Sequence, residues 1–239
     1  GTISKVGTGT LTLTGANTYT GATTSLAGGG GISLDFSAAG APATNIFNTT
    51  TNSSALSMGG GTLTLTGKAS TSNSQRLNGL TISGGINTIQ LNANVTANPL
   101  VLTLGALTRT GGTVNFNLPT GTQSATNGVT TSSSNDATGI LGNWATVNGT
   151  DLAAVNAGNI VAYTGYVDVD ALAGGAAPTI NDGSTANVRI FNDGVSGNIG
   201  LGAATTTINT LTMGNATYAS TVDTAEKALV TGAVLIGSG

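Results

Sequence analysis

Alternation of apolar and polar residues dominates this chain from its first positions. The heptapeptide GTLTLTG at residues 9–15 returns unchanged at residues 61–67, with leucine and threonine in turn. In a β-strand, successive side chains point to opposite faces, so a period of two gives one apolar and one polar face. The pattern therefore predicts β-strands as the main element of the fold.

The same alternation recurs along both halves of the chain, and Gly or Asn separates most of the runs. Both residue types tolerate the positive φ angles that turns require. Short helices are predicted only at residues 151–158 and 224–229. Further strands are predicted at residues 32–36, 80–83, 86–92, 100–104, 114–118, 159–163, 166–170, 187–191, 206–211 and 233–237.

Short gaps between the predicted strands leave little room for crossover helices. We therefore expect an all-β fold, a right-handed parallel β-helix (β-solenoid) in which each coil lays short strands on the coil before it. Apolar residues would point inwards, while Thr and Asn would stack outside. The two heptapeptides start at positions 9 and 61, a separation that fits two to three coils of ~20–25 residues. Both copies are expected on the same face of the solenoid.

Three regions are expected along the chain. Residues 1–118 are predicted to form solenoid coils, and residues 159–239 to continue them. The intervening residues 119–158 are rich in Ser, Thr and Asn and contain the single tryptophan, Trp144. We interpret this stretch as a loop-rich lobe that protrudes from the solenoid and is anchored by Trp144.

A known repeat resembles residues 1–24, GTISKVGTGTLTLTGANTYTGATT. The segment is similar to the autotransporter-associated β-strand repeat, also called the passenger-associated transport repeat. It has the glycines and leucines of that repeat at the same spacing, and it ends on the same Asn-x-Tyr-x-Gly pattern. The resemblance implies a parallel β-helix that is secreted or displayed on a bacterial cell surface. The repeat carries no catalytic residues. The matching positions are Lys5, Gly7, Gly9, Thr10, Leu11, Leu13, Gly15, Asn17, Tyr19, Gly21 and Thr23.

Composition narrows the choice of partners. Charged residues make up 6% of the 239 residues and the net charge is −3, against ~25% charged residues in ordinary soluble domains. Nucleic acid is not an expected partner, because binding it needs a concentrated basic surface.

The absence of Cys is compatible with an extracellular protein that does without disulfides. No stretch of about 18 apolar residues is present, so no transmembrane helix is expected. The six basic residues are scattered: Lys5, Lys68, Arg76, Arg109, Arg189 and Lys227.

Candidate chemistry is limited to carboxylates, because the chain has no His and no Cys. Thiol nucleophiles, Ser-His-Asp triads and imidazole-bound metals are thereby excluded. Asp168 and Asp170 lie two apart on one predicted strand, a spacing open to a glycosidase or a calcium site. Alternation alone predicts two solvent-facing residues there, and we favour that interpretation. Asp182 and Asp193, each in an Asn-Asp-Gly sequence, are interpreted as turn residues rather than a calcium ladder. No catalytic, cofactor-binding or metal-binding residue is predicted.

Other motifs receive structural interpretations. The glycine run at residues 28–31 lacks the Lys-Ser/Thr of a phosphate loop and is expected to be a turn with close coil packing. Isolated packing roles are favoured for the four tyrosines over a sugar-stacking stripe. Glycosylation of the sequons is left open. The tyrosines are Tyr19, Tyr163, Tyr166 and Tyr218, and the sequons begin at Asn48, Asn52, Asn94, Asn148 and Asn215.

The first and last segments, GTISKV and ALVTGAVLIGSG, are strand-like and apolar. Solenoid ends are normally covered, so we expect neighbouring copies to cover them, head to tail or by a donated strand. The leading hypothesis is a non-enzymatic, secreted bacterial structural protein that assembles with itself into an extracellular filament or surface layer. A second is an adhesin passenger segment that contacts glycans or surfaces through residues 119–158. A third is a β-helix polysaccharide-degrading enzyme that uses Asp168 and Asp170.

Overall fold

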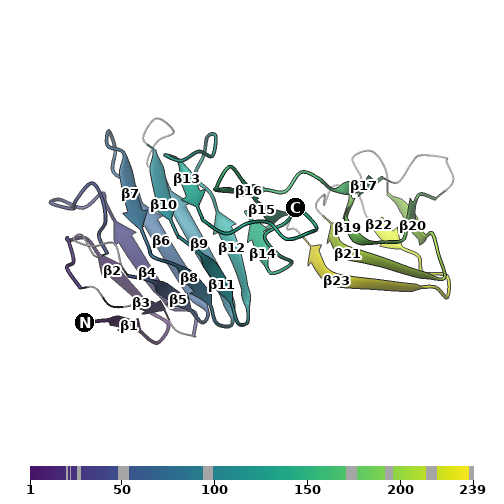
Figure 1. The fold of residues 1–239 in the computed structure, drawn as a ribbon, viewed down its shortest axis with the longest axis horizontal. Helices are drawn as coiled ribbons and strands as arrows, with labels where there is room; N and C mark the ends of the chain where they lie inside the picture. The colour runs from purple at the N-terminus through teal and green to yellow at the C-terminus, as the bar shows by residue number, and fades with distance from the viewer. Residues whose placement is uncertain are drawn as a thin grey trace. The chain divides into compact units, whose positions relative to one another are not determined.

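In the computed structural model, all regular elements of the described residues are β-strands (Figure 1). The all-β expectation is confirmed. Within the described part of the chain, no helix is long and apolar enough to cross a membrane. The structure describes residues 1–19, 21, 23–25, 28–47, 54–93, 99–170, 177–191, 196–213 and 220–236.

Both predicted helices are wrong. Residues 151–156 form strand β15 (Asp151–Asn156), and a turn after residue 223 leads into strand β23 (Ala228–Ile236). Helices of two turns are marginal unless packing supports them. Here both segments contribute to β-strands instead. Strand β15 pairs antiparallel with β14 (Ala145–Val147), and β23 pairs parallel with β21 (Thr205–Met213).

The contacts divide the chain into two compact units. The first unit comprises Gly1–Ser134 and Val155–Val161, and the second comprises Asn135–Ala154 and Ala162–Gly239. The predicted lobe, residues 119–158, is therefore shared between the units.

The first unit stacks parallel strands in three columns. From β5 to β13 the chain visits the three columns in turn, whereas the strands β1 to β4 alternate between the first two columns. This is the β-solenoid that the alternation predicts. The first column is β1 (Ile3–Lys5), β3 (Thr23–Ser25), β5 (Leu56–Met58), β8 (Leu80–Ile82) and β11 (Leu107–Arg109). The second is β2 (Thr10–Leu13), β4 (Gly31–Asp35), β6 (Gly61–Thr66), β9 (Ile86–Asn92) and β12 (Thr113–Asn117). The third is β7 (Asn73–Arg76), β10 (Leu100–Thr103) and β13 (Gly128–Thr130), with β16 (Asn159–Ala162) antiparallel to β13.

In the second column, apolar side chains stack on apolar side chains in register. Leu13 of β2, Leu34 of β4, Leu65 of β6 and Leu91 of β9 form one such row. The last three of these leucines are buried. The two heptapeptides thus occupy the same sheet, with β4 between them, as predicted.

Coil length varies more than expected. In the first column, Ile3 pairs with Thr23, and Thr23 in turn pairs with Leu56, so the second coil is longer than the first by more than half. The longer coil includes residues 37–55, a stretch without apolar alternation. The register is therefore kept by the strands, while the connections between them change in length.

The turns between the first two columns stack as closely as the strands. At Gly112, where φ is +73°, a Cβ atom would collide with the backbone of Gly84 and Gly85. The buried side chain of Asn87 joins three successive rungs there. Its amide donates to the carbonyl oxygens of Gly84 and Thr113, both at 2.9 Å, and its oxygen accepts from the Gly60 N–H at 2.8 Å. A buried amide is stable in the core only when paired in this way.

The second unit has two columns of parallel strands around a core of aliphatic side chains. Part of the predicted lobe packs on it, because Asn187 and Asn209 donate to the carbonyl and hydroxyl oxygens of Thr138, at 2.9 and 3.0 Å. Trp144 lies half-buried beside Gly142. One column is β17 (Val167–Val169), β19 (Gly183–Ile190), β21 and β23, and the other is β18 (Thr179–Ile180), β20 (Gly197–Leu201) and β22 (Ser220–Val222). The core residues are Val169, Ile180, Val188, Ile190, Ile199, Leu201, Ile208 and Leu211.

Shortening a central member of the leucine row tests the stacking. Leu65→Ala leaves a cavity between Leu34 and Leu91 and should lower the free energy of unfolding by about 2–5 kcal/mol. Thr64→Ala, on the outer face of the same strand, should change it by less than about 0.5 kcal/mol. Urea denaturation followed by far-ultraviolet circular dichroism measures both. Equal losses in the two variants would argue against a leucine row at the core.

Candidate functional site

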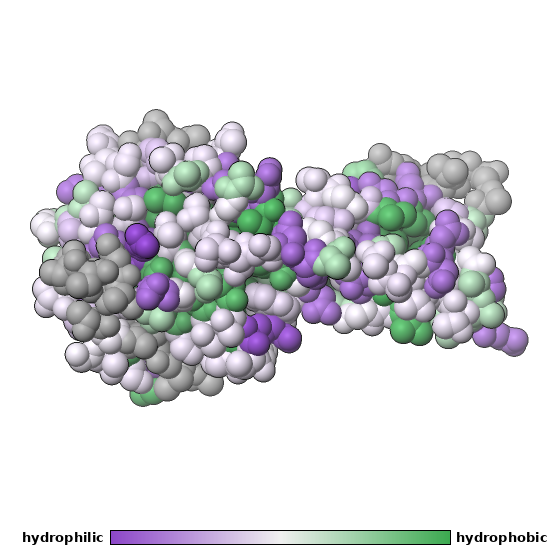
Figure 2. Space-filling model, viewed as in Figure 1, coloured by the Kyte–Doolittle hydropathy of each residue, from purple (hydrophilic) through white to green (hydrophobic). Residues whose placement is uncertain are grey.

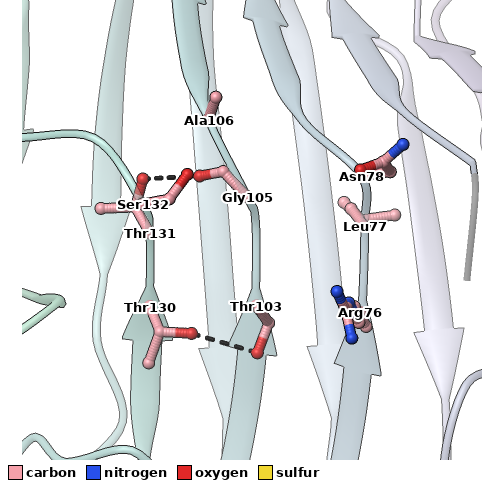
Figure 3. A pocket seen from close by; sticks show the side chains of 9 residues that line it. All are labelled: Arg76, Leu77, Asn78, Thr103, Gly105, Ala106, Thr130, Thr131 and Ser132. Carbon is pink, nitrogen blue, oxygen red and sulfur yellow. Dashed lines mark hydrogen bonds between the residues drawn. The ribbon is translucent and has the colours of Figure 1, made fainter.

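A groove of about 470 Å³ lies on the third column of the first unit (Figure 3). Strand pairing places Arg76 of β7, Thr103 of β10 and Thr130 of β13 side by side in one row. The Thr130 hydroxyl donates to the Thr103 hydroxyl at 3.0 Å, so the row is ordered by its own hydrogen bonding. The groove is lined by Arg76, Leu77, Asn78, Thr103, Gly105, Ala106, Thr130, Thr131 and Ser132.

Most of the side chains that line this groove are polar. Arg76, Asn78 and Ser132 are exposed, whereas Thr131 is buried and donates to the Gly105 carbonyl oxygen at 2.7 Å. Arg76 forms no ion pair with any carboxylate of the described residues. The groove therefore offers a solvent-facing guanidinium beside hydroxyl and amide groups, which suits a hydroxylated ligand that carries a negative charge.

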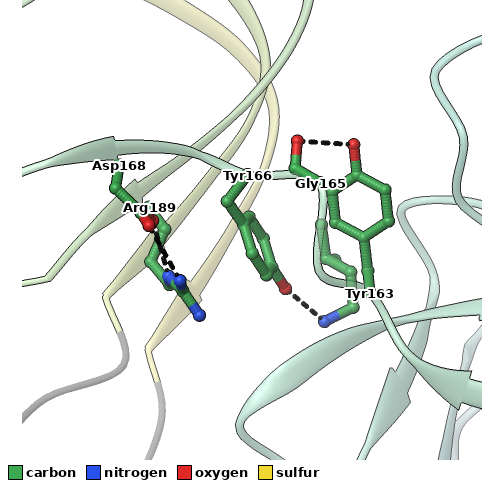
Figure 4. Close-up of polar contacts among 6 residues, drawn as sticks. Tyr163, Gly165, Tyr166, Asp168 and Arg189 are labelled. Carbon is green, nitrogen blue, oxygen red and sulfur yellow. Dashed lines mark hydrogen bonds and ion pairs between the residues drawn. The ribbon is translucent and has the colours of Figure 1, made fainter.

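A second cluster surrounds Arg189 in the second unit (Figure 4). Arg189 on β19 lies opposite Asp168 on β17, and its Nε and Nη2 donate to the two carboxylate oxygens at 2.8 and 3.0 Å. The guanidinium also stacks on the rings of Tyr166 and Phe191, with centroid distances of 4.7 and 5.1 Å. This two-pronged, stacked geometry is the one that arginine favours. The ion pair between Arg189 and Asp168 thus links two successive rungs, β17 and β19.

The pairing bears on the glycosidase alternative that the spacing of Asp168 and Asp170 left open. Both carboxylate oxygens of Asp168 accept hydrogen bonds from Arg189, so this side chain is engaged in a two-pronged ion pair. Asp170 lies just after β17, and its Oδ1 is buried without a hydrogen-bond partner among the described residues. The arrangement gives Asp168 a structural role, because its ion pair with Arg189 joins β17 to β19.

The tyrosines of the described chain do not form one stripe. Tyr163 and Tyr166 meet edge to face, with ring centroids 4.9 Å apart, and Tyr166 accepts a hydrogen bond from the Leu152 N–H at 2.8 Å. Tyr19, in the first unit, packs edge to face on Phe47 at 6.0 Å. Each ring is engaged in local packing. Tyr218 lies outside the described residues.

The remaining candidates hold turns together. Asp182 accepts a hydrogen bond from the backbone N–H of Thr207, on the next rung, at 2.6 Å. Within the described ranges, no group of three or more Asp, Glu, His or Cys side chains could hold a metal ion.

At Gly30, a Cβ would collide with the carbonyl oxygen of Gly7, so close coil packing explains this glycine. Asn148 is exposed at φ +53° in the β14–β15 turn. Asp193 and the sequons at Asn48, Asn52, Asn94 and Asn215 lie outside the described residues.

Sequence reasoning missed the groove, because β7 has no apolar alternation. Its inward residues are the amides Asn73 and Gln75. Gln75 accepts from the Phe47 N–H at 3.0 Å and donates to the Phe47 carbonyl at 3.2 Å. Such amides satisfy the backbone of the neighbouring loop, so a polar strand can be buried. The sequence does contain one sign of the groove, because Arg76, Thr103 and Thr130 are equally spaced along the chain and pair on successive rungs.

These features define a parallel β-solenoid built on a short strand repeat. The Passenger-associated-transport-repeat family matches residues 3–29, so the resemblance drawn from the first residues is confirmed. The chain is also similar to the Adhesin BmaC autotransporter of Brucella suis biovar 1, with 41% identity over 144 residues. That region is 60% of this chain but only 4% of the relative. No solved structure matches the chain.

The Tyr166 phenol gives a pH-dependent prediction. Burial raises the pKa of Tyr166 from 10.0 to about 12. Between these values the unfolded chain has lost the phenol proton while the folded chain retains it. The folded chain therefore binds one proton more than the unfolded chain in this range, so the free energy of unfolding falls as the pH rises. The stability that the protonated Tyr166 phenol contributes is fully present below pH 10 and is lost as the pH rises towards 12. Tyr166→Phe should show a smaller drop in urea midpoint between pH 9 and pH 11.5 than the unmodified chain.

Tyr163→Phe is the matched control, because it leaves the bond between Tyr166 and Leu152 in place. Its midpoint should fall with pH as steeply as that of the unmodified chain. An equally steep fall in Tyr166→Phe would contradict the assignment of the alkaline loss to Tyr166.

Proposed function

We propose that this chain is a non-enzymatic passenger segment of a surface-displayed bacterial adhesin, which contacts glycans or glycan-coated surfaces. The observation that carries the proposal is the similarity to the Brucella autotransporter adhesin, combined with a confirmed passenger-associated transport repeat. The chain spans 4% of that relative's length. Display at the cell surface and the absence of catalysis are parts of this proposal.

The outer face of the second column has the chemistry that such contacts use. Thr64, Gln90 and Asn117 stand side by side on β6, β9 and β12. Asn117 donates to the Gln90 side-chain oxygen at 2.7 Å, and Asn115 donates to Asn117 at 2.7 Å. Figure 2 shows a face of mostly pale, weakly polar surface. Fixed hydroxyl and amide groups exchange hydrogen bonds with sugar hydroxyls, and without charges this contact depends little on salt.

Bead attachment tests the proposal. Microspheres coated with the purified chain should be retained on mucin-coated glass under flow several times better than albumin-coated microspheres, and high salt should remove only part of the retention. Removal of the mucin glycans with glycosidases should lower it towards the albumin level. Retention no better than that of albumin on every glycan-coated surface tried would contradict an adhesive role.

A second candidate, assembly into an extracellular filament, is favoured by the exposed apolar side chains of β23. In the described part of the chain, β23 pairs with β21 alone. Leu211 of β21 is 4% exposed, but its neighbour Val234 on β23 is 54% exposed and Ile236 is 73% exposed. The strand carries no charge. A long, apolar, uncharged edge invites a further strand, and stacking of the β1–β2 rung of a second copy would propagate without closing.

Sedimentation velocity tests this second candidate. The unmodified chain should form larger species as its concentration rises, whereas Val234→Lys should remain a monomer because a charge on the edge opposes pairing. Val234→Thr keeps the strand shape without a charge and should associate at an intermediate level. An unmodified chain that stays monomeric across the micromolar range would overturn the filament candidate. A single dimer would point to closed edge-to-edge pairing instead.

A further inference from the structure

We propose that the groove on β7, β10 and β13 binds an anionic polysaccharide that carries uronic-acid carboxylates. In this proposal Arg76 pairs with a carboxylate, and the hydroxyl groups of Thr103 and Thr130 contact sugar hydroxyls. The inference rests on the proposed adhesive function and names the ligand class of one site.

Strand register sets the period of the polar groups. Arg76, Thr103 and Thr130 occupy equivalent positions on three successive rungs. Neighbouring strands lie about 4.8 Å apart, so the row offers a polar group at each step of this length along the stack (Figure 3). An extended polysaccharide presents one ring at a similar interval. A linear chain of sugars laid across the strands therefore meets one polar side chain for each ring.

Gly105 lies in the groove beside this row. Two residues after Thr103, Gly105 has no side chain, whereas the exposed Asn78 and Ser132 lie on the rungs on either side. The Ser132 N–H donates to the Gly105 carbonyl oxygen at 3.0 Å. The exposed side chains thus flank a shallow floor made of backbone, which leaves space for a sugar ring.

The groove is held in shape before any ligand arrives. Thr131 donates to Gly105, and the Ser133 N–H donates to the Thr131 hydroxyl at 3.1 Å. The hydrogen bond between the Thr130 and Thr103 hydroxyls fixes the orientation of both side chains. Groups on rigid strands that are already oriented lose little conformational freedom when a ligand binds.

Arg76 selects the charge of the ligand. Its side chain is exposed, and among the residues that the structure describes the one ion pair is that of Arg189 with Asp168. The guanidinium therefore keeps its donors available for a carboxylate, which it can hold with two parallel hydrogen bonds. The other polar groups of the groove are neutral and would accept sugars of either kind. Arg76 thus makes an acidic sugar preferable to a neutral one.

Polygalacturonate and its fully methyl-esterified form provide matched probes, because they share one backbone and differ in charge. Biolayer interferometry with the immobilised full chain, in low-salt buffer with EDTA, should show binding of polygalacturonate and markedly weaker binding of the ester. Arg76→Gln should weaken polygalacturonate binding about fivefold, the effect of losing an exposed ion pair. Thr130→Val should weaken both probes, because it removes a hydroxyl that either ligand contacts.

Arg109→Gln is the charge control, since Arg109 is an exposed arginine on another column of the same unit. It should bind polygalacturonate as the unmodified chain does, and circular dichroism should show that every variant is folded. Equal binding by Arg76→Gln and the unmodified chain, or equal binding of the two probes, would overturn the inference. If neither probe binds while coated microspheres still attach to mucin, the uronate site fails and the adhesive function stands.

Discussion

Register-locked stacking of parallel strands is the constraint on which the whole structure depends. Each rung presents apolar residues to the interior at the same positions as the rung before it, so Leu34, Leu65 and Leu91 bury one another. A slip of one residue would turn every leucine outwards. The same register aligns polar residues outside, and it brings Arg76, Thr103 and Thr130 together although each comes from a different coil.

Most of the fold could be read from alternation, because strands of four or more residues with one buried face leave a clear period of two. Predicted residues 86–92 coincide with β9, and predicted residues 114–118 lie within one residue of β12. Some strands that are very short, or that lack this period, were missed. β5 has three residues and β7 is polar throughout. Their burial is set by neighbours on adjacent rungs, which a local pattern does not contain.

The predicted helix at residues 151–158 shows a different limit. Apolar Leu152, Ala153 and Ala154 suit a helix by propensity, but the Asn148–Gly149 pair before them takes positive φ angles and closes a hairpin. Asn-Gly between two strands is a strong hairpin signal, and it outweighs helix propensity here. Among the candidate site residues, the aspartates and the tyrosines entered the sequence analysis, whereas the groove did not. The groove depends on coil lengths, which differ widely even within the first column.

Spin labelling tests the stacking register most directly, because the chain contains no Cys and each introduced thiol is unique. Thr12 pairs with Ser33, and Ser33 pairs with Thr64, so labels at Thr12→Cys and Thr64→Cys lie two rungs apart. Asn117 lies two rungs further on. Electron paramagnetic resonance should give backbone separations of about 10 Å for the first pair and about 19 Å for Thr12→Cys with Asn117→Cys. Separations that are equal, or that fail to double, would contradict the stacked solenoid.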